Sequence, residues 1–379
     1  MRYLLKHGHL IIDGNREFLD GAILIEDGRI AEVFPQTDRI REPLEDCVSE
    51  DLKGSLVMPG FFDTHTHGAM GSVFDSADQD SLDEIAHRYA LDGTTSFLAT
   101  LSYDLSEESF CTRLKDLENY QSPYSRFEGI HMEGPFLSPK YAGAGDPNKF
   151  LRPEPETVKK FLASSSRIRQ ITVACELEGA SEIASFLHQN GIRVMCGHSA
   201  AVYEDLDGNV DGFTHLFNAM RGLHHRDKTI VNCAFMNRWY CELIADGIHI
   251  DRNVLKLILD QIDRDLIILI SDSSPARGMP DGEYPFLSHR CIRKGGAFLT
   301  EDGHLAGSVA SILDEMKVLY ELGAKYTDLL LYSSLNAFRF YGLDQRFGTI
   351  EKGKYADLVF LSDDLEMKKV MIGGNWIHE

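Results

Sequence analysis

The sequence lacks the marks of a secreted, membrane or nucleic-acid-binding protein. No apolar run approaches the roughly 18 residues of a membrane helix, and the first nine residues contain no apolar core of the signal-peptide type. The seven cysteines are scattered without a C-x-x-C pair, which is typical of reduced thiols. Basic residues are in deficit, with 38 Lys and Arg against 59 Asp and Glu, so the surface would repel a phosphate backbone. We therefore expect a cytoplasmic protein that binds neither membranes nor nucleic acid.

Signatures of several enzyme classes are also absent. The chain contains no G-x-S-x-G motif for a nucleophilic serine, no P-loop and no G-x-G-x-x-G fingerprint. What is present is a globular balance of 43% hydrophobic and 26% charged residues, which excludes wholesale disorder. The 379 residues are enough for two or three domains, one of which could be an α/β barrel.

Strand-like runs separated by turn residues occur at both ends of the chain. The N-terminal runs include a D-G hairpin signal at Asp27-Gly28. Neither end is long enough to bury a hydrophobic core of its own. We therefore expect residues 1–56 and 345–379 to combine into one small β-sandwich domain, with residues 57–344 inserted between them.

The inserted segment alternates between short apolar runs and stretches with helical spacing. The apolar runs are residues 56–62, 94–101, 127–132, 170–175, 192–196, 212–216, 241–245 and 266–270. Eight strands that alternate with helices are the pattern of a (β/α)8 barrel. The sequence thus predicts an α/β fold, a TIM-type barrel with the small β-sandwich domain attached.

Side chains that bind metals follow the ends of these predicted strands. They are His65, His67, Glu133, His198, His215 and Asp272. Active sites of such barrels are built at the carboxyl ends of the strands, so we expect the six to meet there. His65 and His67 are two residues apart and would point to the same side of a strand. Glu133 can offer one carboxylate oxygen to each of two ions.

Two of these choices have alternatives. His131 lies two residues before Glu133 and competes for its role, but a histidine there is more often a hydrogen-bonded part of the wall, so we prefer Glu133. Asp272, taken alone, fits a helix N-cap equally well. The other five ligands favour a place in the site.

The ligand set indicates a reaction class. Histidine and carboxylate ligands suit one or two Zn²⁺ or Fe²⁺ ions rather than Mg²⁺. Such an ion lowers the pKa of bound water from 15.7 to about 7, so hydroxide is available to attack at neutral pH. Asp272 would take the proton and return it to a leaving nitrogen. We expect hydrolysis of a C–N bond without a covalent intermediate.

Six motifs resemble the N-acetylglucosamine-6-phosphate deacetylase family of the amidohydrolase superfamily. They lie at residues 59–68, 131–136, 197–200, 214–220, 245–249 and 305–308. The resemblance runs essentially from end to end. It implies a homodimer that releases acetate from a 6-phosphorylated N-acetyl amino sugar.

The resemblance also assigns roles to the ligands. Glu133, His198 and His215 would hold one metal ion. His65 and His67 would be the additional pair of members that bind two ions, with Glu133 as the bridge. Asp272 would be the catalytic acid and base.

Substrate contacts follow from the same motifs. The loop 221–228 is a basic segment in an acidic chain, and Arg226 and His225 in it would bind the phosphate. Asn218 and the backbone of Ala219 would add donors. The resemblance further implies sugar or phosphate contacts for His249 and a substrate contact for Leu305.

Two departures from the family pattern concern the substrate. Gly145, which we also expect to contact the substrate, stands where members usually carry a histidine that helps to polarise the acetyl carbonyl. Arg277, expected near the pocket, has no counterpart in the family pattern. Both departures are compatible with a second interpretation, a related amidohydrolase that acts on N-acetylgalactosamine 6-phosphate, another N-acyl compound or a cyclic amide. A third reading is a sugar-phosphate binding protein with little catalytic activity, against which the complete ligand set argues.

Overall fold

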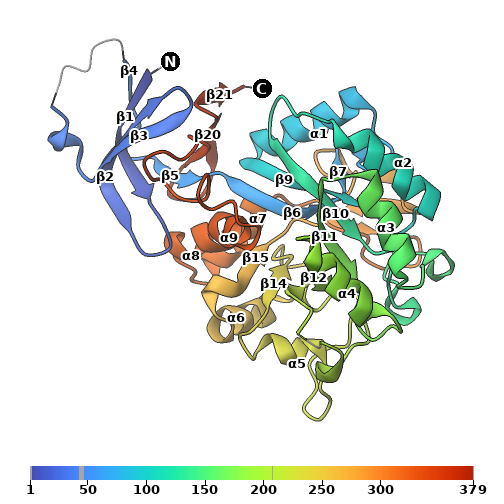
Figure 1. Ribbon diagram of the computed structural model, residues 1–379. Coiled ribbons are helices and arrows are strands. Elements are labelled where there is room, and N and C mark those ends of the chain that lie inside the picture. The colour runs from blue at the N-terminus through green and yellow to red at the C-terminus, as the bar shows by residue number, and fades with distance from the viewer. Residues whose placement is uncertain (1, 42–46, 207, 379) are drawn as a thin grey trace.

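The computed structural model describes residues 2–41, 47–206 and 208–378. Figure 1 shows a barrel of strands surrounded by helices, with a separate sheet that contains both ends of the chain. The barrel strands run parallel and are, in their order around the sheet, β6 (Phe61–Thr66), β9 (Thr94–Leu101), β10 (Arg126–Glu133), β11 (Ile168–Val173), β12 (Arg193–Cys196), β13 (Gly212–Phe213), β14 (Tyr240–Leu243) and β15 (Ile267–Leu269). The predicted TIM-type barrel is confirmed.

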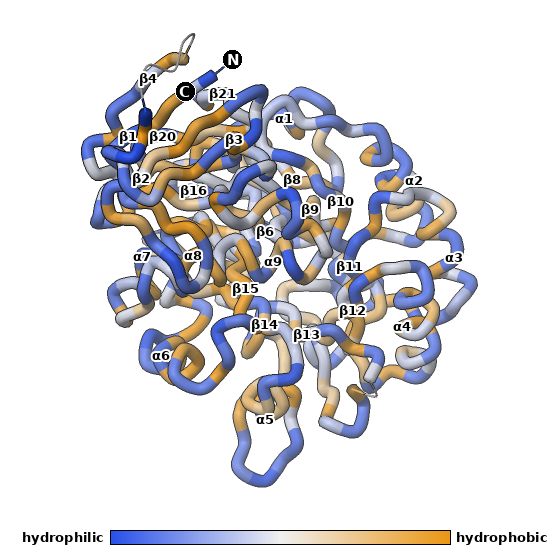
Figure 2. Tube along the Cα trace, turned by 60° about the vertical axis from the view of Figure 1, so that its left-hand side comes forward, coloured by the Kyte–Doolittle hydropathy of each residue, from blue (hydrophilic) through white to orange (hydrophobic). Residues whose placement is uncertain are grey.

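Helices follow most of these strands and pack on the outside of the barrel (Figure 1). They are α1 (Gln79–Leu91), α2 (Glu107–Glu118), α3 (Pro155–Ser164), α4 (Ala180–Gln189), α5 (Ile230–Ala234), α6 (Arg252–Gln261), α7 (Ile312–Glu321), α8 (Tyr326–Leu330) and α9 (Asn336–Phe340), with a π-helical turn at Leu331–Leu335 between the last two. In α1, Leu82, Ile85 and Tyr89 are buried at helical spacing, and the Asp78 side chain caps the first turn. Figure 2 shows hydrophilic and hydrophobic segments on these outer helices, as expected where one face is buried.

Strands from both chain ends form one eight-stranded sheet. Its members are β1 (Arg2–Ile11), β2 (Glu17–Glu26), β3 (Arg29–Phe34), β4 (Val48–Asp51), β5 (Leu56–Pro59), β19 (Leu358–Leu361), β20 (Met367–Ile372) and β21 (Asn375–Ile377). The central strand β5 pairs with β1 on one side and with the C-terminal β19 on the other. The expected association of the two chain ends is therefore present.

The prediction that residues 56–62 form the first barrel strand is wrong for the first half of this segment. Residues 56–59 are β5 of the terminal sheet, and the barrel begins at Phe61. Both segments are fully buried, so their apolar patterns are alike. The chain crosses between the sheets at Gly60, where a Cβ atom would lie 2.2 Å from Thr95. The domain boundary expected after residue 56 falls inside β5, and we propose that it follows Pro59.

Short elements complete the fold above the barrel. Two antiparallel sheets contain β7 (Gly68–Ala69) with β8 (Ser72–Val73), and β16 (Gly282–Phe286) with β17 (His289–Lys294) and β18 (Ala297–Leu299). Brief 3-10 turns lie at Thr37–Arg39, Pro139–Tyr141, Pro147–Lys149, Tyr203–Asp205 and Arg264–Leu266. Among the described residues, no helix is both long and apolar enough to cross a membrane.

The barrel closes between its first and last strands through contacts just beyond β15. The Asp272 N–H donates to the His65 carbonyl at 2.8 Å, and the His67 N–H donates to the Ser273 carbonyl at 2.9 Å. Below them, the Asp63 carboxylate accepts hydrogen bonds from the Ser271 N–H at 3.1 Å and from the Ser271 hydroxyl at 2.5 Å. This seam, formed by Asp63, His65, His67 and residues 271–273, closes the barrel and holds three predicted site residues.

Arg277 strengthens the seam and does not face the pocket. Its Nη2 lies 2.8 Å from Asp92 Oδ2, its Nη1 lies 3.9 Å from Asp63 Oδ2, and its guanidinium stacks over the Tyr89 ring at 4.6 Å. Burial opposes the charge, but Asp92 and other neighbours hold the pKa of Arg277 above its ordinary value. The expectation that Arg277 lies near the pocket is wrong, because its guanidinium is held by Asp92 and Asp63 and the residue is not among those that line the cavity.

We predict that Arg277→Met lowers the free energy of unfolding by about 3 kcal/mol, because the buried Asp63 and the half-buried Asp92 lose the cation that faces them. This loss is at the lower end of the range for broken buried ion pairs, because Arg88 still binds Asp92 in the variant. Denaturant unfolding measures the change. Arg290→Met is the control, since the exposed Arg290–Glu283 pair should contribute less than about 1 kcal/mol. Equal losses in the two variants would contradict the buried role of Arg277.

Candidate active site

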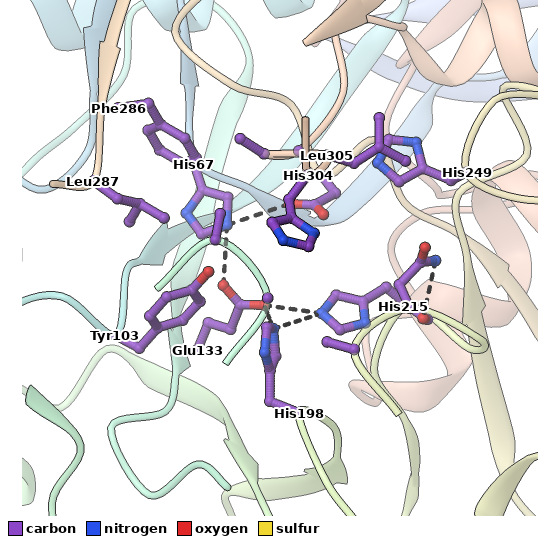
Figure 3. A pocket seen from close by; sticks show the side chains of 17 residues that line it. His67, Tyr103, Glu133, His198, His215, His249, Phe286, Leu287, His304 and Leu305 are labelled. Atoms are coloured by element: carbon purple, nitrogen blue, oxygen red, sulfur yellow. Dashed lines mark hydrogen bonds and ion pairs between the residues drawn. The ribbon is translucent and has the colours of Figure 1, made fainter. Parts of the chain in front are cut away.

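The six predicted ligands meet at the carboxyl ends of the barrel strands. His65 and His67 lie at the end of β6, Glu133 ends β10, and His198, His215 and Asp272 follow β12, β13 and β15. All six are buried, with at most 8% of any residue exposed. Figure 3 shows His67, Glu133, His198 and His215 pointing toward one another. The structure thus brings together side chains up to 207 positions apart in the sequence, as between His65 and Asp272.

One group of potential metal ligands consists of Glu133, His198 and His215. The Nε2 atoms of the two histidines lie 3.1 Å apart, and they lie 3.1 and 3.0 Å from Glu133 Oε1. Ligands at tetrahedral corners, each about 2.0–2.1 Å from a zinc ion, are about 3.3 Å apart. The spacing of the three atoms therefore fits a single ion between them.

The second group consists of His65, His67 and the same glutamate. The two Nε2 atoms lie 3.4 Å apart, and His67 Nε2 is 3.2 Å from Glu133 Oε2. Asp272 Oδ1 approaches the same two nitrogens at 3.5 and 3.3 Å. Glu133 thus presents one oxygen to each group, and Asp272 borders the second.

Hydrogen bonds behind the rings fix how two of the histidines face the site. His198 Nδ1 lies 2.9 Å from the Tyr141 carbonyl, an acceptor only, so this nitrogen donates and Nε2 keeps its lone pair. His67 Nδ1 lies 3.3 Å from the Ser102 hydroxyl, which donates to Asp75. Such contacts to the far nitrogen are usual for histidines that bind metals.

His131, the alternative to Glu133, belongs to the wall. Its two ring nitrogens lie 3.2 and 2.9 Å from the hydroxyls of Thr100 and Thr172. Burial and the neighbouring His65 hold the pKa of His131 well below its usual value, so the ring is neutral. It is in neither ligand group.

The site carries strong electrostatic coupling between its acids and bases. Burial opposes charge on His67, but Asp272 and Glu133 raise its pKa to about 10. Burial would raise the pKa of Asp272, and His65 and His67 instead hold it below its usual value. The two buried carboxylates therefore need compensating positive charge, which protons or metal ions can supply.

The backbone is strained at three of the ligands. His198, His215 and Asp272 have φ angles of 46°, 32° and 45°, in the left-handed region that residues other than glycine rarely adopt. Such conformations persist where the surrounding structure enforces them, and they gather at functional sites. The strands thus end abruptly where the ligands must turn inward.

Glu242 is a residue of the site that the sequence reasoning missed. It is fully buried in β14, and its Oε1 accepts hydrogen bonds from Gln170 and Thr64 at 3.0 and 3.3 Å. Its Oε2 lies 3.7 Å from His65 Nδ1, and neither atom has a hydrogen-bond partner among the described residues. The sequence does contain an indication of this residue, because a glutamate within the otherwise apolar run 241–245 is unusual.

A cavity of about 260 Å³ opens over the ligands. Among the predicted substrate contacts, it is lined by Asn218, Ala219, His249 and Leu305. Tyr103, which the sequence analysis did not consider, also lines it (Figure 3).

Three other predicted contacts are not among the residues that line this cavity. Arg226 and His225 are exposed on the loop between β13 and α5, which projects from the barrel in Figures 1 and 2. Gly145 lies behind Tyr103, because a Cβ atom on Gly145 would be 2.2 Å from the Tyr103 ring.

We predict that Glu242→Gln weakens divalent-metal binding by the His65/His67 group about 10- to 100-fold, because the carboxylate behind His65 is lost. Competition with a chromophoric chelator measures the affinity. Glu315→Gln is the matched control: burial raises the pKa of Glu315 well above its usual value, so a neutral group replaces a neutral group. Unchanged affinity in Glu242→Gln, or the same loss in the control, would contradict this role.

Comparisons with known proteins agree with this geometry. The Amidohydrolase family profile matches residues 56–377. An N-acetylgalactosamine-6-phosphate deacetylase of Escherichia coli O157:H7 is 33% identical over 365 residues, 94% of each chain. An N-acetylglucosamine-6-phosphate deacetylase of Bacillus subtilis (strain 168) is 33% identical over 378 residues, 96% of this chain and 94% of that one.

A similar solved structure is a mutant N-acetyl-D-glucosamine-6-phosphate deacetylase from Mycobacterium smegmatis in complex with N-acetyl-D-glucosamine-6-phosphate. Its TM-score is 0.89 at 26% identity, with 99% of both chains covered. The family match and the two buried His/Glu groups together support a divalent metal at this site. Because the family profile matches residues 56–377 and relatives at 33% identity cover nearly the whole chain, the chain belongs to the amidohydrolase family.

Proposed function

We propose that this protein removes the acetyl group of N-acetylglucosamine 6-phosphate by metal-dependent hydrolysis, giving glucosamine 6-phosphate and acetate. One observation carries the proposal: two buried His/Glu ligand groups share Glu133, and the Asp272 carboxylate lies beside them at the cavity. The names of the similar enzymes supply the substrate class.

N-acetylgalactosamine 6-phosphate is the second candidate substrate. The Escherichia coli relative named for that sugar is as similar to this chain as the Bacillus subtilis relative named for the glucosamine epimer, both at 33% identity. The two sugars differ only in the orientation of one hydroxyl, so the same metal chemistry serves both.

The ligand set is suited to Zn²⁺ or Fe²⁺, one or two per chain. Glu133, His198 and His215 would hold one ion, and His65 and His67 a second one with Glu133 as the bridge. Bound there, the metal lowers the pKa of water and polarises the acyl carbonyl.

Asp272 performs the proton transfers in this mechanism. Its carboxylate lies beside the nitrogens of His65 and His67, within the cavity, and takes the proton of the attacking water. The same group then delivers the proton to the sugar nitrogen as the C–N bond breaks. His249, Asn218, Leu305 and the backbone of Ala219 orient the sugar.

Phosphate recognition falls to the exposed loop. The Arg226 guanidinium has no ion-pair partner among the described residues, whereas Arg221 pairs with Asp227 and Lys228 pairs with Glu204. A free guanidinium is suited to a bidentate phosphate contact. His225 lies next to it and adds a donor.

The proposal includes a cytoplasmic homodimer. All seven cysteines are free in the structure, which agrees with a reducing compartment. The dimer follows from the family resemblance, and light scattering measures it.

Acetate release tests the function directly. The purified protein is analysed for metals, stripped with a chelator, reloaded with Zn²⁺ or Fe²⁺ and assayed with both sugar phosphates and with unphosphorylated N-acetylglucosamine. We expect turnover of a sugar phosphate that depends on the metal. Turnover no higher than in the metal-free sample would overturn the proposal, and tight binding without hydrolysis would favour a binding protein.

We predict that Asp272→Asn lowers kcat by about 10²- to 10⁴-fold, because the amide cannot accept the proton. Metal content, measured on the same sample by elemental analysis, should stay close to that of the unchanged protein. If the metal is lost together with the activity, Asp272 acts mainly as a ligand.

We predict that Arg226→Ala raises KM for the phosphorylated sugar about 10- to 100-fold, the value of a hydrogen-bonded charge pair. Steady-state kinetics with and without the 6-phosphate measure the effect, which should vanish for the unphosphorylated sugar. Lys228→Ala in the same loop is the control and should leave KM nearly unchanged. An unchanged KM in Arg226→Ala would assign the phosphate to other residues.

A further inference from the structure

Hydrolysis of an amide places negative charge on the acyl oxygen, and a hydrogen-bond donor near that oxygen lowers the barrier. Outside the two ligand groups and Asp272, four side chains of the cavity lining can donate a hydrogen bond. They are Tyr103, Asn218, His249 and His304.

Three of these four side chains are already hydrogen-bonded, lie away from Glu133, or are largely exposed to solvent. The Asn218 amide donates to the carbonyls of His215 and Leu216 at 3.3 and 3.5 Å. His249 Nδ1 is held by Asp246 at 2.8 Å, and Figure 3 shows this ring at the end of the cavity away from Glu133. The His304 side chain is 67% exposed and lies beside Asp302.

Tyr103 is placed differently. It follows β9, is only 5% exposed, and packs its ring against His198 with 5.1 Å between centroids. Its hydroxyl has no hydrogen-bond partner among the described residues, and Figure 3 shows it pointing toward Glu133 and His67. A tyrosine hydroxyl, with an ordinary pKa of about 10, carries its proton at neutral pH and can donate it.

The glycine at position 145 belongs to the same arrangement. A Cβ atom there would lie 2.2 and 2.7 Å from two carbons of the Tyr103 ring, so the ring occupies the space of any side chain at that position. Gly143 and Ala144, its neighbours, line the cavity and carry no side-chain donor. Among the described residues, the wall on this side of the ligands therefore offers one side-chain donor, the hydroxyl of Tyr103.

We propose that Tyr103 is a catalytic residue whose hydroxyl donates a hydrogen bond to the acyl oxygen of the substrate while water attacks the carbonyl carbon. The inference rests on the proposed amide hydrolysis. Tyr103 keeps its proton throughout: the C–N bond breaks, Asp272 moves the proton to the nitrogen, and the hydroxyl only stabilises the charge on the oxygen.

Tyr103→Phe tests the proposal, because it keeps the ring and removes only the hydroxyl. We expect kcat for the N-acetyl sugar phosphate to fall about 100-fold, as when one donor to such an oxygen is removed. KM and metal content should stay nearly unchanged. The control is Tyr120→Phe, since Tyr120 is also buried but donates to Asp83 at 3.0 Å, outside the cavity lining, and should keep full activity.

An activated substrate separates catalysis from a structural defect. The carbonyl of an N-trifluoroacetyl sugar phosphate is more electrophilic and depends less on a donor, so Tyr103→Phe should lose much less activity with it than with the N-acetyl compound. Equal losses with both substrates, a kcat within about threefold of the unchanged protein, or loss of metal would overturn the proposal. Failure of the unchanged protein to hydrolyse either substrate would instead overturn the proposed function itself, and the inference with it.

Discussion

The structure depends on two carboxylates and four imidazoles that are buried together, and no lysine or arginine among the described residues forms an ion pair with either carboxylate. Glu133 and Asp272 lie among His65, His67, His198 and His215, and the nearest nitrogen and oxygen atoms are 3.0–3.5 Å apart. Burying carboxylates without compensation is costly. A divalent cation offsets this cost and also suits the geometry of the ligands. The buried carboxylates that destabilise the metal-free fold therefore also favour binding of the metal.

The barrel makes this arrangement possible through its seam. The hydrogen bonds that close the barrel between β6 and the segment after β15 come from the backbones of His65, His67, Asp272 and Ser273. The same hydrogen bonds therefore close the barrel and position Asp272. The buried Arg277 and Asp63 and the half-buried Asp92 lie behind the seam and are not among the residues that line the cavity.

The two ends of the substrate would contact parts of the protein that differ in burial and charge. In the proposed complex the acyl group would lie over buried side chains fixed by strand ends and by hydrogen bonds, whereas the phosphate would meet an exposed basic loop on an acidic protein of net charge −21. A local cluster of cations can attract an anion where the overall field repels it, because screening limits the field to about 10 Å. In the proposed mechanism, the rate would therefore depend on the buried site and the substrate affinity on the exposed loop.

The sequence by itself determined the barrel, the association of the two chain ends, and six side chains that meet at the carboxyl ends of the strands. Parallel strands bring their carboxyl ends to one edge, so a histidine or carboxylate just after each strand is placed without knowledge of the packing. Only the tertiary structure decided that residues 56–59 join the terminal sheet, that Arg277 binds Asp92 behind the strands, that Glu242 approaches His65, and that Tyr103 fills the space beside Gly145. Each of these depends on which distant residue a buried side chain meets, and local patterns of polarity do not encode that choice.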